Sequence, residues 1–343
     1  MDRSRRLVLG AAALLLVACI VVAAGTGAFA ISPTQLLRVL WSLASGAADP
    51  SPEYLVFVNI RLPRLLLGVA AGAGLGMAGT LMQGMFRNPL ADPGLIGISS
   101  GAALAAGMTI VLGAWLLPML PRTLGSWSLV TMAFAGGFLV TLLIYGLSQS
   151  EGGTRMALML LAGIAVNALA GAGLGFLSVI ATDEQLRSLQ FWLLGSLGGA
   201  RWSAVLLVAA IVLAACCAAL TLAAPLNAIA LGESQAQLLG VDVERTKRRA
   251  ILVTAVAVGS VTATTGVIGF IGLIAPHWVR MVAGPDHRTV LPASGLAGAS
   301  LVLAADAVAR TAMAPSELPL GVLTAVIGVP MFLIMLRRFR GRM

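Results

Sequence analysis

Charged side chains that could pair with anions are the main chemical features of an otherwise apolar sequence. Arg61 and Arg64 flank Pro63 at the start of one apolar run, and Arg310 lies near the end of another. Arginine at a helix N-terminus opposes the helix dipole, so this arrangement calls for anionic partners. The pattern predicts a basic surface that pairs with carboxylates of a docking protein or with lipid phosphates.

Asp306 is the only acidic residue well inside an apolar run. An ionisable residue in such a position is a candidate proton or sodium site, as in an ion-coupled secondary transporter. Arg310 follows at position i+4, on the same face of a helix. We therefore favour a structural ion pair between Asp306 and Arg310.

The sequence predicts no catalytic or metal site. His277 and His287 have no companion at the spacing of metal ligands, and no Ser/His/Asp set or carboxylate pair stands out. The chain has no GxxxxGK[ST] loop, and its only lysine, Lys247, follows no such loop. We expect no enzyme activity, no metal and no cofactor. Asn167, within the fifth apolar run, could line a pathway or bond a neighbouring helix.

The elements that must position these residues are predicted membrane helices. The 343 residues are 59% apolar and 10% charged, with a mean hydropathy of +0.98, whereas a soluble domain carries about 25% charged residues. Most of the ten apolar runs reach the ~20 residues that span a bilayer. They cover residues 7–31, 62–85, 94–117, 127–148, 155–181, 202–224, 250–268, 269–283, 289–310 and 318–336. We predict an all-α polytopic membrane protein, with residues 1–343 in a single domain of about ten transmembrane helices.

The distribution of basic residues predicts the orientation of these helices. If the N-terminus is cytoplasmic, 15 of the 22 basic residues fall in inside segments. The other seven fall outside: Arg38, Arg61, Arg64, Arg122, Arg187, Arg201 and Arg310. Cytoplasmic loops carry the excess of positive charge, so both termini are predicted to be cytoplasmic. This bias also accounts for the net charge of +9 without a nucleic-acid partner.

Two segments on the predicted cytoplasmic side depart from the apolar pattern. Residues 225–248 form an amphipathic insert that ends in a basic cluster, although a direct connection could be far shorter. The insert therefore predicts a docking surface for a soluble partner. Residues 86–94 contain two prolines, Asn88 and Asp92, which are typical of a turn. This turn either connects two helices or also touches a cytoplasmic subunit.

Small residues predict close packing of the second run and a break between two later runs. Gly68, Gly72 and Gly76 lie four residues apart, so they share one face of a helix. Such a face lets two helix backbones approach closely in lipid. The segment 267–273 is rich in glycine and is followed by Pro276, which predicts a broken or short helix.

Four ordered blocks of this sequence resemble the FecCD family of permeases, and the resemblance covers nearly the whole chain. They are residues 61–102, which begin RLPRLLLGVAAGAGLG, 231–241 (LGESQAQLLGV), 269–288 (GFIGLIAPHWVRMVAGPDHR) and 317–332 (ELPLGVLTAVIGVPMF). Members of this family are the membrane subunits of type II ABC importers for vitamin B12, ferric siderophores and haem. The resemblance implies a transport subunit and not an enzyme.

The resemblance also implies partners. A homodimer with ten helices per subunit would lie in the bacterial inner membrane. Two ATP-binding subunits would sit on the cytoplasmic side and one substrate-binding protein on the periplasmic side. ATP would be bound by the partner subunit, and alternating access at the dimer axis would move the substrate.

Family positions assign roles to particular residues. The insert at 225–248 matches the coupling helices that dock on the ATPase, with motif residues Leu231, Gly232, Glu233, Ala236, Leu239, Gly240 and Val241. Arg61, Arg64 and Arg310 match arginines that pair with acidic residues of the binding protein. The cytoplasmic turn carries Asn88, Pro89, Asp92 and Pro93. The pathway is implied along the fifth and tenth helices, with Asn167 and Leu174 as candidates.

Three substrates remain open at this point. The form of residues 84–106, GMFRNPLADPGLIGISSGAALAA, looks most like haem permeases. An apolar pathway with methionines would suit a large planar ligand, and it would equally suit a cobalamin. We favour haem, ahead of a ferric siderophore and then vitamin B12. The alternative from a different class is the ion-coupled secondary transporter that uses Asp306.

Overall fold

Among the described residues, ten helices match the predicted apolar runs, and we call them the long helices. The computed structural model describes residues 3–27, 29–46, 49–116, 125–313 and 316–340. The long helices are α1 (Arg3–Gly25), α4 (Leu62–Phe86), α5 (Ile98–Leu116), α6 (Gly125–Leu147), α7 (Met156–Ile180), α9 (Trp202–Thr221), α12 (Val243–Thr265), α13 (Ile271–Ala283), α14 (His287–Thr311) and α15 (Leu320–Arg340). Each of them corresponds to one of the ten predicted apolar runs.

Several of these helices have the length and composition of membrane spans. Among the described residues, seven helices are long and apolar enough to cross a bilayer: α1, the continuous segment that ends with α4, α6, α7, α9, α14 and α15. The apolar helices α5 and α13 are shorter, and α12 begins in the basic part of the insert. The prediction of an all-α polytopic membrane protein is confirmed.

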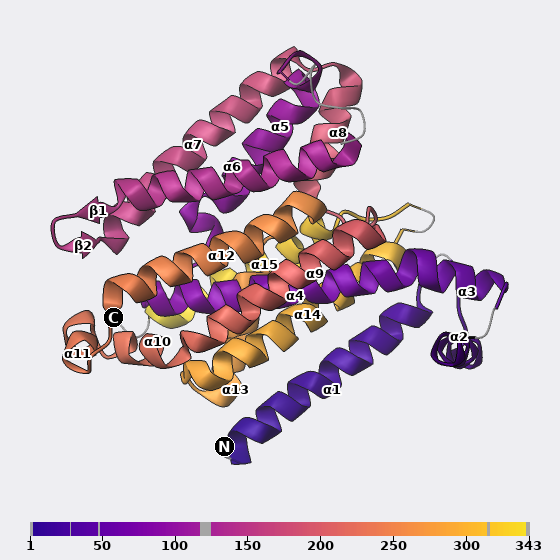
Figure 1. Ribbon diagram of the computed structural model, residues 1–343, viewed down its shortest axis with the longest axis horizontal. Helices are drawn as coiled ribbons and strands as arrows, with labels where there is room; N and C mark the ends of the chain where they lie inside the picture. The colour runs from indigo at the N-terminus through magenta and orange to yellow at the C-terminus, as the bar shows by residue number, and fades with distance from the viewer. Residues whose placement is uncertain (1–2, 28, 47–48, 117–124, 314–315, 341–343) are drawn as a thin grey trace.

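Short elements gather at the two ends of the long helices. They are α2 (Pro33–Ser45), α3 (Pro52–Val56), η1 (Phe57–Arg61), η2 (Pro93–Ile96), α8 (Asp183–Leu194), α10 (Ala223–Ala230), α11 (Glu233–Leu238) and the hairpin of β1 (Gln149–Ser150) and β2 (Gly153–Thr154). Figure 1 shows α2, α3 and α8 at one end of the molecule, and α11 with the hairpin at the other. We call these the outer end and the inner end, after the predicted orientation.

The two ends also separate the basic residues into the two predicted groups. Helix α1 begins and helix α15 ends at the inner end (Figure 1). The arginines predicted to be outside lie on α2 and α8, at the start of α4 and α9, and near the end of α14. Arg122 and Arg342 lie outside the described residues. The location of the inner end in the cytoplasm stays a prediction.

Helix α4 lies at the centre of the bundle, and nearly every residue from Pro63 to Met85 is buried. It contacts α9, α12, α13 and α14, while α5 and α6 pack on the other side of α12 (Figure 1). Helices α7 and α15 are mostly exposed, although their sequences are strongly apolar. Their exposed faces must therefore contact lipid or another protein chain.

The central helix crosses α14 in an antiparallel arrangement with a regular register. A Cβ atom at Gly76 would overlap the carbonyl oxygen of Ser294, and one at Gly72 would overlap the backbone of Gly298 and Ala299. Gly68, one turn further along, faces the side chain of Leu303. The close crossing predicted from the glycine stripe is confirmed.

The chain is interrupted between α12 and α13, as predicted. Residues 266–270 are not helical, and Gly266 and Phe270 have φ angles of 71° and 66°. Ser196 donates its N–H to the carbonyl oxygen of Thr265 at 2.7 Å, which satisfies the end of α12. The break leaves α13 with only 13 residues.

Replacing Gly76 by alanine should destabilise the protein, because the backbone of α4 or α14 must move to accept the methyl group. We expect a loss of about 1–3 kcal/mol, measured as a lower midpoint of thermal unfolding in detergent. The matched control is Gly10→Ala on α1, where an added Cβ meets nothing within 4 Å and alanine is the better helix former. Equal midpoints for the two variants would contradict a tight crossing.

Candidate functional site

At the outer end, Arg64 holds two carboxylates that are far from it in sequence. Its Nη2 lies 2.8 Å from Oδ1 of Asp306, and its Nε donates to both Asp306 oxygens at 3.0 and 3.1 Å. Its Nη1 and Nη2 each donate to one oxygen of Glu317 at 2.9 Å. Arg64 and Asp306 are buried, whereas Glu317 is exposed just before α15. One guanidinium therefore joins α4, α14 and the start of α15.

The other two arginines of this cluster bind the end of α1. Arg310 lies 3.0 Å from Asp306 Oδ2, and it donates to the carbonyl oxygens of Ala23 and Thr26 at 3.0 and 2.9 Å. Arg61 donates to the carbonyl oxygens of Ala24 and Phe29. The last carbonyls of a helix have no partner within it and carry the negative end of its dipole. The two arginines therefore cap the C-terminus of α1.

This arrangement corrects the prediction of an exposed basic surface. Only 4% of Arg61, 8% of Arg64 and 7% of Arg310 is exposed. The argument that Arg61 and Arg64 need an external anion was wrong, because carboxylates and carbonyls within the chain satisfy them. Pairing of these arginines with a binding protein stays a prediction.

The predicted ion pair between Asp306 and Arg310 is confirmed. The sequence analysis missed Arg64 as a second partner of Asp306, since the two residues are 242 positions apart. It also missed Glu317, whose position directly before the last apolar run was the only available signal. With its carboxylate buried and bonded to two arginines, Asp306 offers no open site for a coupling ion.

Replacing Arg64 by glutamine should destabilise the protein strongly. It removes the cationic partner of Glu317 and one of the two arginines that pair with Asp306. Breaking a buried ion pair costs about 3–5 kcal/mol, which should appear as a large fall in the thermal midpoint. Arg187→Gln on α8 is the control, since Arg187 is exposed at the same end. A fall in the midpoint no larger than that of the control would contradict this account of the network.

At the inner end, the predicted docking insert contains two short helices, α10 and α11, and the second of them lies between two glycines. Gly232 and Gly240 have φ angles of 121° and 80°, where glycine is favoured, and they reverse the chain on either side of α11. Ala236 is fully buried and packs with Ile229 and Val243. Ala236 therefore holds α11 against α10 and α12 and is not available for a direct contact with a partner.

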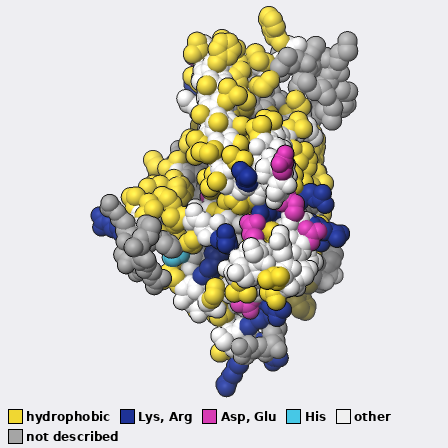
Figure 2. Space-filling view, turned by 90° about the vertical axis from the view of Figure 1, so that its left-hand side faces the viewer, with side chains coloured by type: hydrophobic (Ala, Val, Ile, Leu, Met, Phe, Trp, Pro, Cys, Tyr) yellow, Lys and Arg dark blue, Asp and Glu magenta, His cyan; other side chains and the backbone are white. Residues whose placement is uncertain are grey.

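Three leucines of the insert are largely exposed, because no described residue covers them. The exposed fractions are 67% for Leu231, 88% for Leu238 and 65% for Leu239. Figure 2 looks onto the inner end and shows basic side chains in its lower half, below a mainly hydrophobic upper part. The sequence analysis named Leu231 and Leu239 but missed Leu238, which is the most exposed of the three. Docking of a partner on these leucines stays a prediction.

Glu233 has an internal partner. Its Oε2 accepts a hydrogen bond from Nζ of Lys247 at 2.7 Å, and the same Nζ donates to the carbonyl oxygen of Thr154 at 3.1 Å. Close by, Glu244 accepts hydrogen bonds from the N–H and hydroxyl groups of Thr154 and from Tyr145. The insert, the β hairpin and α12 therefore form one polar cluster. A direct contact of Glu233 with an ATPase stays a prediction.

The segment after α4 forms the predicted turn, and hydrogen bonds from its backbone to its own polar side chains stabilise it. Asn88 accepts a hydrogen bond from the N–H of Leu90 at 2.9 Å, and Asp92 accepts one from Gly94 at 2.8 Å, next to Pro93 at the start of η2. Pro89 lines a cavity of about 280 Å³ together with Ala230 of the insert. The turn therefore lies beside the insert, while its contact with another subunit stays a prediction.

Asn167 and Leu174 both face α5. Asn167 accepts a hydrogen bond from the hydroxyl of Ser100 and donates to the carbonyl oxygen of Gly94 at 3.4 Å. A Cβ at Gly107 would lie 3.0 Å from Leu174. Asn167 thus bonds a neighbouring helix, which was one of its two predicted roles. Both side chains are partly exposed, and their role in a pathway stays a prediction.

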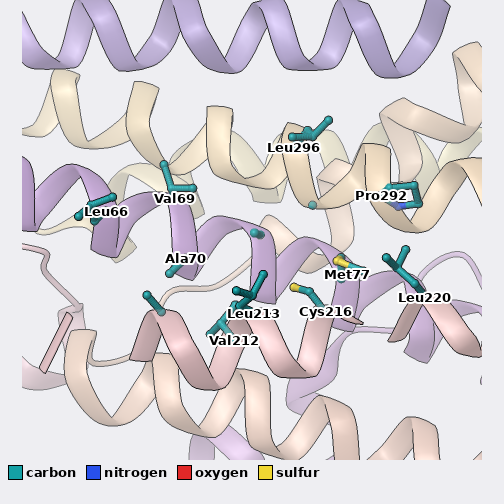
Figure 3. Close-up of a pocket in the computed structure, with 13 residues that line it drawn as sticks. Leu66, Val69, Ala70, Met77, Val212, Leu213, Cys216, Leu220, Pro292 and Leu296 are labelled. Carbon is teal, nitrogen blue, oxygen red and sulfur yellow. The ribbon is translucent and has the colours of Figure 1, made fainter. Parts of the chain in front are cut away.

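An apolar cavity of about 480 Å³ lies elsewhere, between α4, α9 and α14. Figure 3 shows Met77, Leu213 and Leu296 around it, with the sulfur atoms of Met77 and Cys216 facing the same space. No residue of α7 or α15 lines it. The pathway candidates therefore lie outside this cavity, on the face of the chain that carries α7. In the described part of the chain, no three His, Cys, Asp or Glu residues cluster as metal ligands.

Sequence comparisons identify close relatives. The model of the FecCD transport family matches residues 15–338. The chain is 45% identical over 336 residues to the hemin transport system permease protein HmuU of Yersinia pestis, which covers 98% of this chain and 96% of that protein. It is 41% identical over 305 residues to a cobalamin import system permease protein BtuC of Halobacterium salinarum (89% and 79%). A vitamin B12 import system permease protein BtuC of Klebsiella pneumoniae is 37% identical over 321 residues (92% and 94%).

Solved structures share the same fold. A structure described as an ABC transporter of metal-chelate type, in an inward-facing conformation, matches with a TM-score of 0.83 and 31% identity, over 96% of this chain and 98% of that chain. PsaBC from Streptococcus pneumoniae matches with a TM-score of 0.55 and 15% identity, over 87% and 94%, which indicates a likeness of fold alone.

Proposed function

Because this chain belongs to the FecCD transport family, we propose that it is the permease of an ATP-driven importer and that its substrate is haem. The observation that carries the choice of substrate is the 45% identity to a hemin permease over 98% of the chain. The chain is a transport subunit and not an enzyme, since its relatives are permeases. ATP would be bound and hydrolysed by a separate subunit.

A homodimer in the bacterial inner membrane accounts for the exposed faces of α7 and α15. Exposed apolar side chains such as Leu161, Ile164 and Val326 have no partner among the described residues. A second copy of the chain would complete a pathway between these faces, and such a pathway would be mostly apolar. Haem is a large planar ligand with an apolar body, which suits such walls.

Two soluble partners would dock at opposite ends. The exposed leucines of the insert support docking of two ATPase subunits at the inner end. A periplasmic binding protein would dock at the outer end, with its acidic residues near Arg61, Arg64 and Arg310. Because Glu317 is the exposed partner of Arg64, an incoming carboxylate would take its place.

Cobalamin is the second candidate substrate, because two of the relatives are cobalamin or vitamin B12 permeases. A ferric siderophore is the third, by family. An ion-coupled secondary transporter is not favoured, since Asp306 is buried and bonded to two arginines. The experiment must therefore separate three ligands and two energy sources.

Uptake into liposomes should identify the substrate directly. The permease is reconstituted with its cognate ATPase and binding protein, and haem, a ferric siderophore and cobalamin are offered in parallel. We expect haem uptake that requires both ATP and the binding protein. The controls are omission of ATP and omission of the binding protein.

ATP-dependent uptake of cobalamin or of the siderophore in place of haem would overturn the substrate and keep the class of transporter. Uptake without ATP that follows an ion gradient would overturn the class itself.

Replacing Leu238 by glutamate should weaken binding of the ATPase, because a charge would replace the most exposed apolar side chain of the insert. Residues at the centre of an interface contribute about 2 kcal/mol or more, so we expect the dissociation constant to rise about 30-fold. Leu147→Glu is the control, since Leu147 is also exposed and lies at the inner end of α6. Equal affinities of the two variants would place the docking surface elsewhere.

A further inference from the structure

Lys247 is a charged residue in an unusual place. It is the only lysine of the chain, it lies in the second turn of α12, and only 3% of it is exposed. The neighbouring Arg248 and Arg249 are exposed. Removing an ammonium group from water is costly unless partners compensate its charge and its hydrogen bonds. The burial of Lys247 therefore depends on the groups around its Nζ atom.

Those groups belong to two separate elements, helix α11 and the β hairpin. Nζ lies 2.7 Å from Glu233 Oε2, at the first residue of α11, and 3.1 Å from the carbonyl oxygen of Thr154, at the end of β2. Thr154 precedes the first residue of α7, Met156, by two positions. One ammonium group thus connects the insert to the start of α7, through α12.

The hairpin side of this connection is firmly held. Glu244, three residues before Lys247, accepts the N–H of Thr154 at 2.9 Å and also its hydroxyl group. Tyr145, near the end of α6, donates to the same carboxylate at 3.2 Å. Since the hairpin is the link between α6 and α7, a displacement of α12 at this point must also displace the start of α7.

The insert side is held by fewer contacts. Helix α11 has six residues, which is too short to be stable alone. Apart from the small apolar cluster around Ala236, the ion pair between Glu233 and Lys247 is its polar attachment to α12. Besides the covalent connection and the apolar cluster, a force that moves α11 is passed to α12 where Lys247 bonds Glu233.

We propose that Lys247 is a positioning residue that transmits movement of α11 to the start of α7. When the ATPase displaces α11, the ion pair carries the displacement to Lys247, and its bond to Thr154 carries it to α7. The inference rests on the proposed function, in which α11 receives the ATPase and α7 borders the pathway. It assigns to Lys247 a role in coupling that is separate from docking.

The test measures how many substrate molecules are imported for each ATP hydrolysed by the complete complex in liposomes. Lys247→Met should lower this ratio about tenfold, a typical coupling between distant sites, while the affinity for the ATPase changes less than twofold. Lys247→Arg should restore most of the ratio, because a guanidinium can donate to both oxygens. Arg249→Met is the matched control, because it removes an exposed positive charge from the same helix outside the insert and should leave the ratio unchanged.

Three results would overturn the inference. The first is an unchanged ratio in Lys247→Met. The second is a parallel loss of ATPase binding, which would mean that Lys247 serves docking alone. The third is failure of Lys247→Arg to restore the ratio when its thermal midpoint matches the wild type.

If Lys247→Met does not fold, Glu233→Gln takes its place. This variant removes the charge of the pair and keeps the bond to Thr154, so the ratio should again fall, and an unchanged ratio would overturn the inference. Failure of the wild-type complex to import any of the three ligands with ATP would instead overturn the proposed function.

Discussion

The contact between α4 and α14 determines where most other elements lie. In lipid, apolar side chains gain little from leaving one apolar environment for another, so close backbone packing must hold the helices together. Small residues at Gly72 and Gly76 bring α4 against Gly298 and Ser294. The two helices run antiparallel, and each step of four residues along α4 matches about four in the opposite direction along α14. The register set by the glycines places Arg64 opposite Asp306, and their ion pair closes the outer end of the contact.

Electrostatics at the outer end follow from this register. Asp306 is paired with two arginines. The remaining positive charge is compensated by Glu317 and by the last carbonyls of α1. In a site shielded from water, such groups cannot rely on solvent for compensation, so each must find a partner within the chain. The cluster therefore connects α1, α4, α14 and the segment before α15, and only the carboxylate of Glu317 is exposed. An external partner can reach the network most easily through this residue.

Much of the fold could be predicted from local patterns, because membrane helices and glycine stripes are encoded by neighbouring residues. The ten apolar runs, the glycine stripe and the pair of Asp306 with Arg310 are of this kind. Helices α2 and α8 were missed, although Ser32 with Gln35 and Thr182 with Gln185 form capping boxes that the sequence displays. The bonds of Arg64 to Asp306 and of Lys247 to Thr154 join residues 242 and 93 positions apart. Such pairs depend on the register of packed helices, which no local pattern specifies.

The capping of α1 has a consequence for the order of assembly in the membrane. This helix is synthesised before α14, with which it makes most of its contacts. Arg61 reaches the carbonyl of Ala24 from 37 positions away, so a first attachment of α1 is available early. Arg310 reaches Ala23 and Thr26 from 287 and 284 positions away. During synthesis, Arg61 can therefore bond the end of α1 long before Arg310 on α14 can add the second attachment.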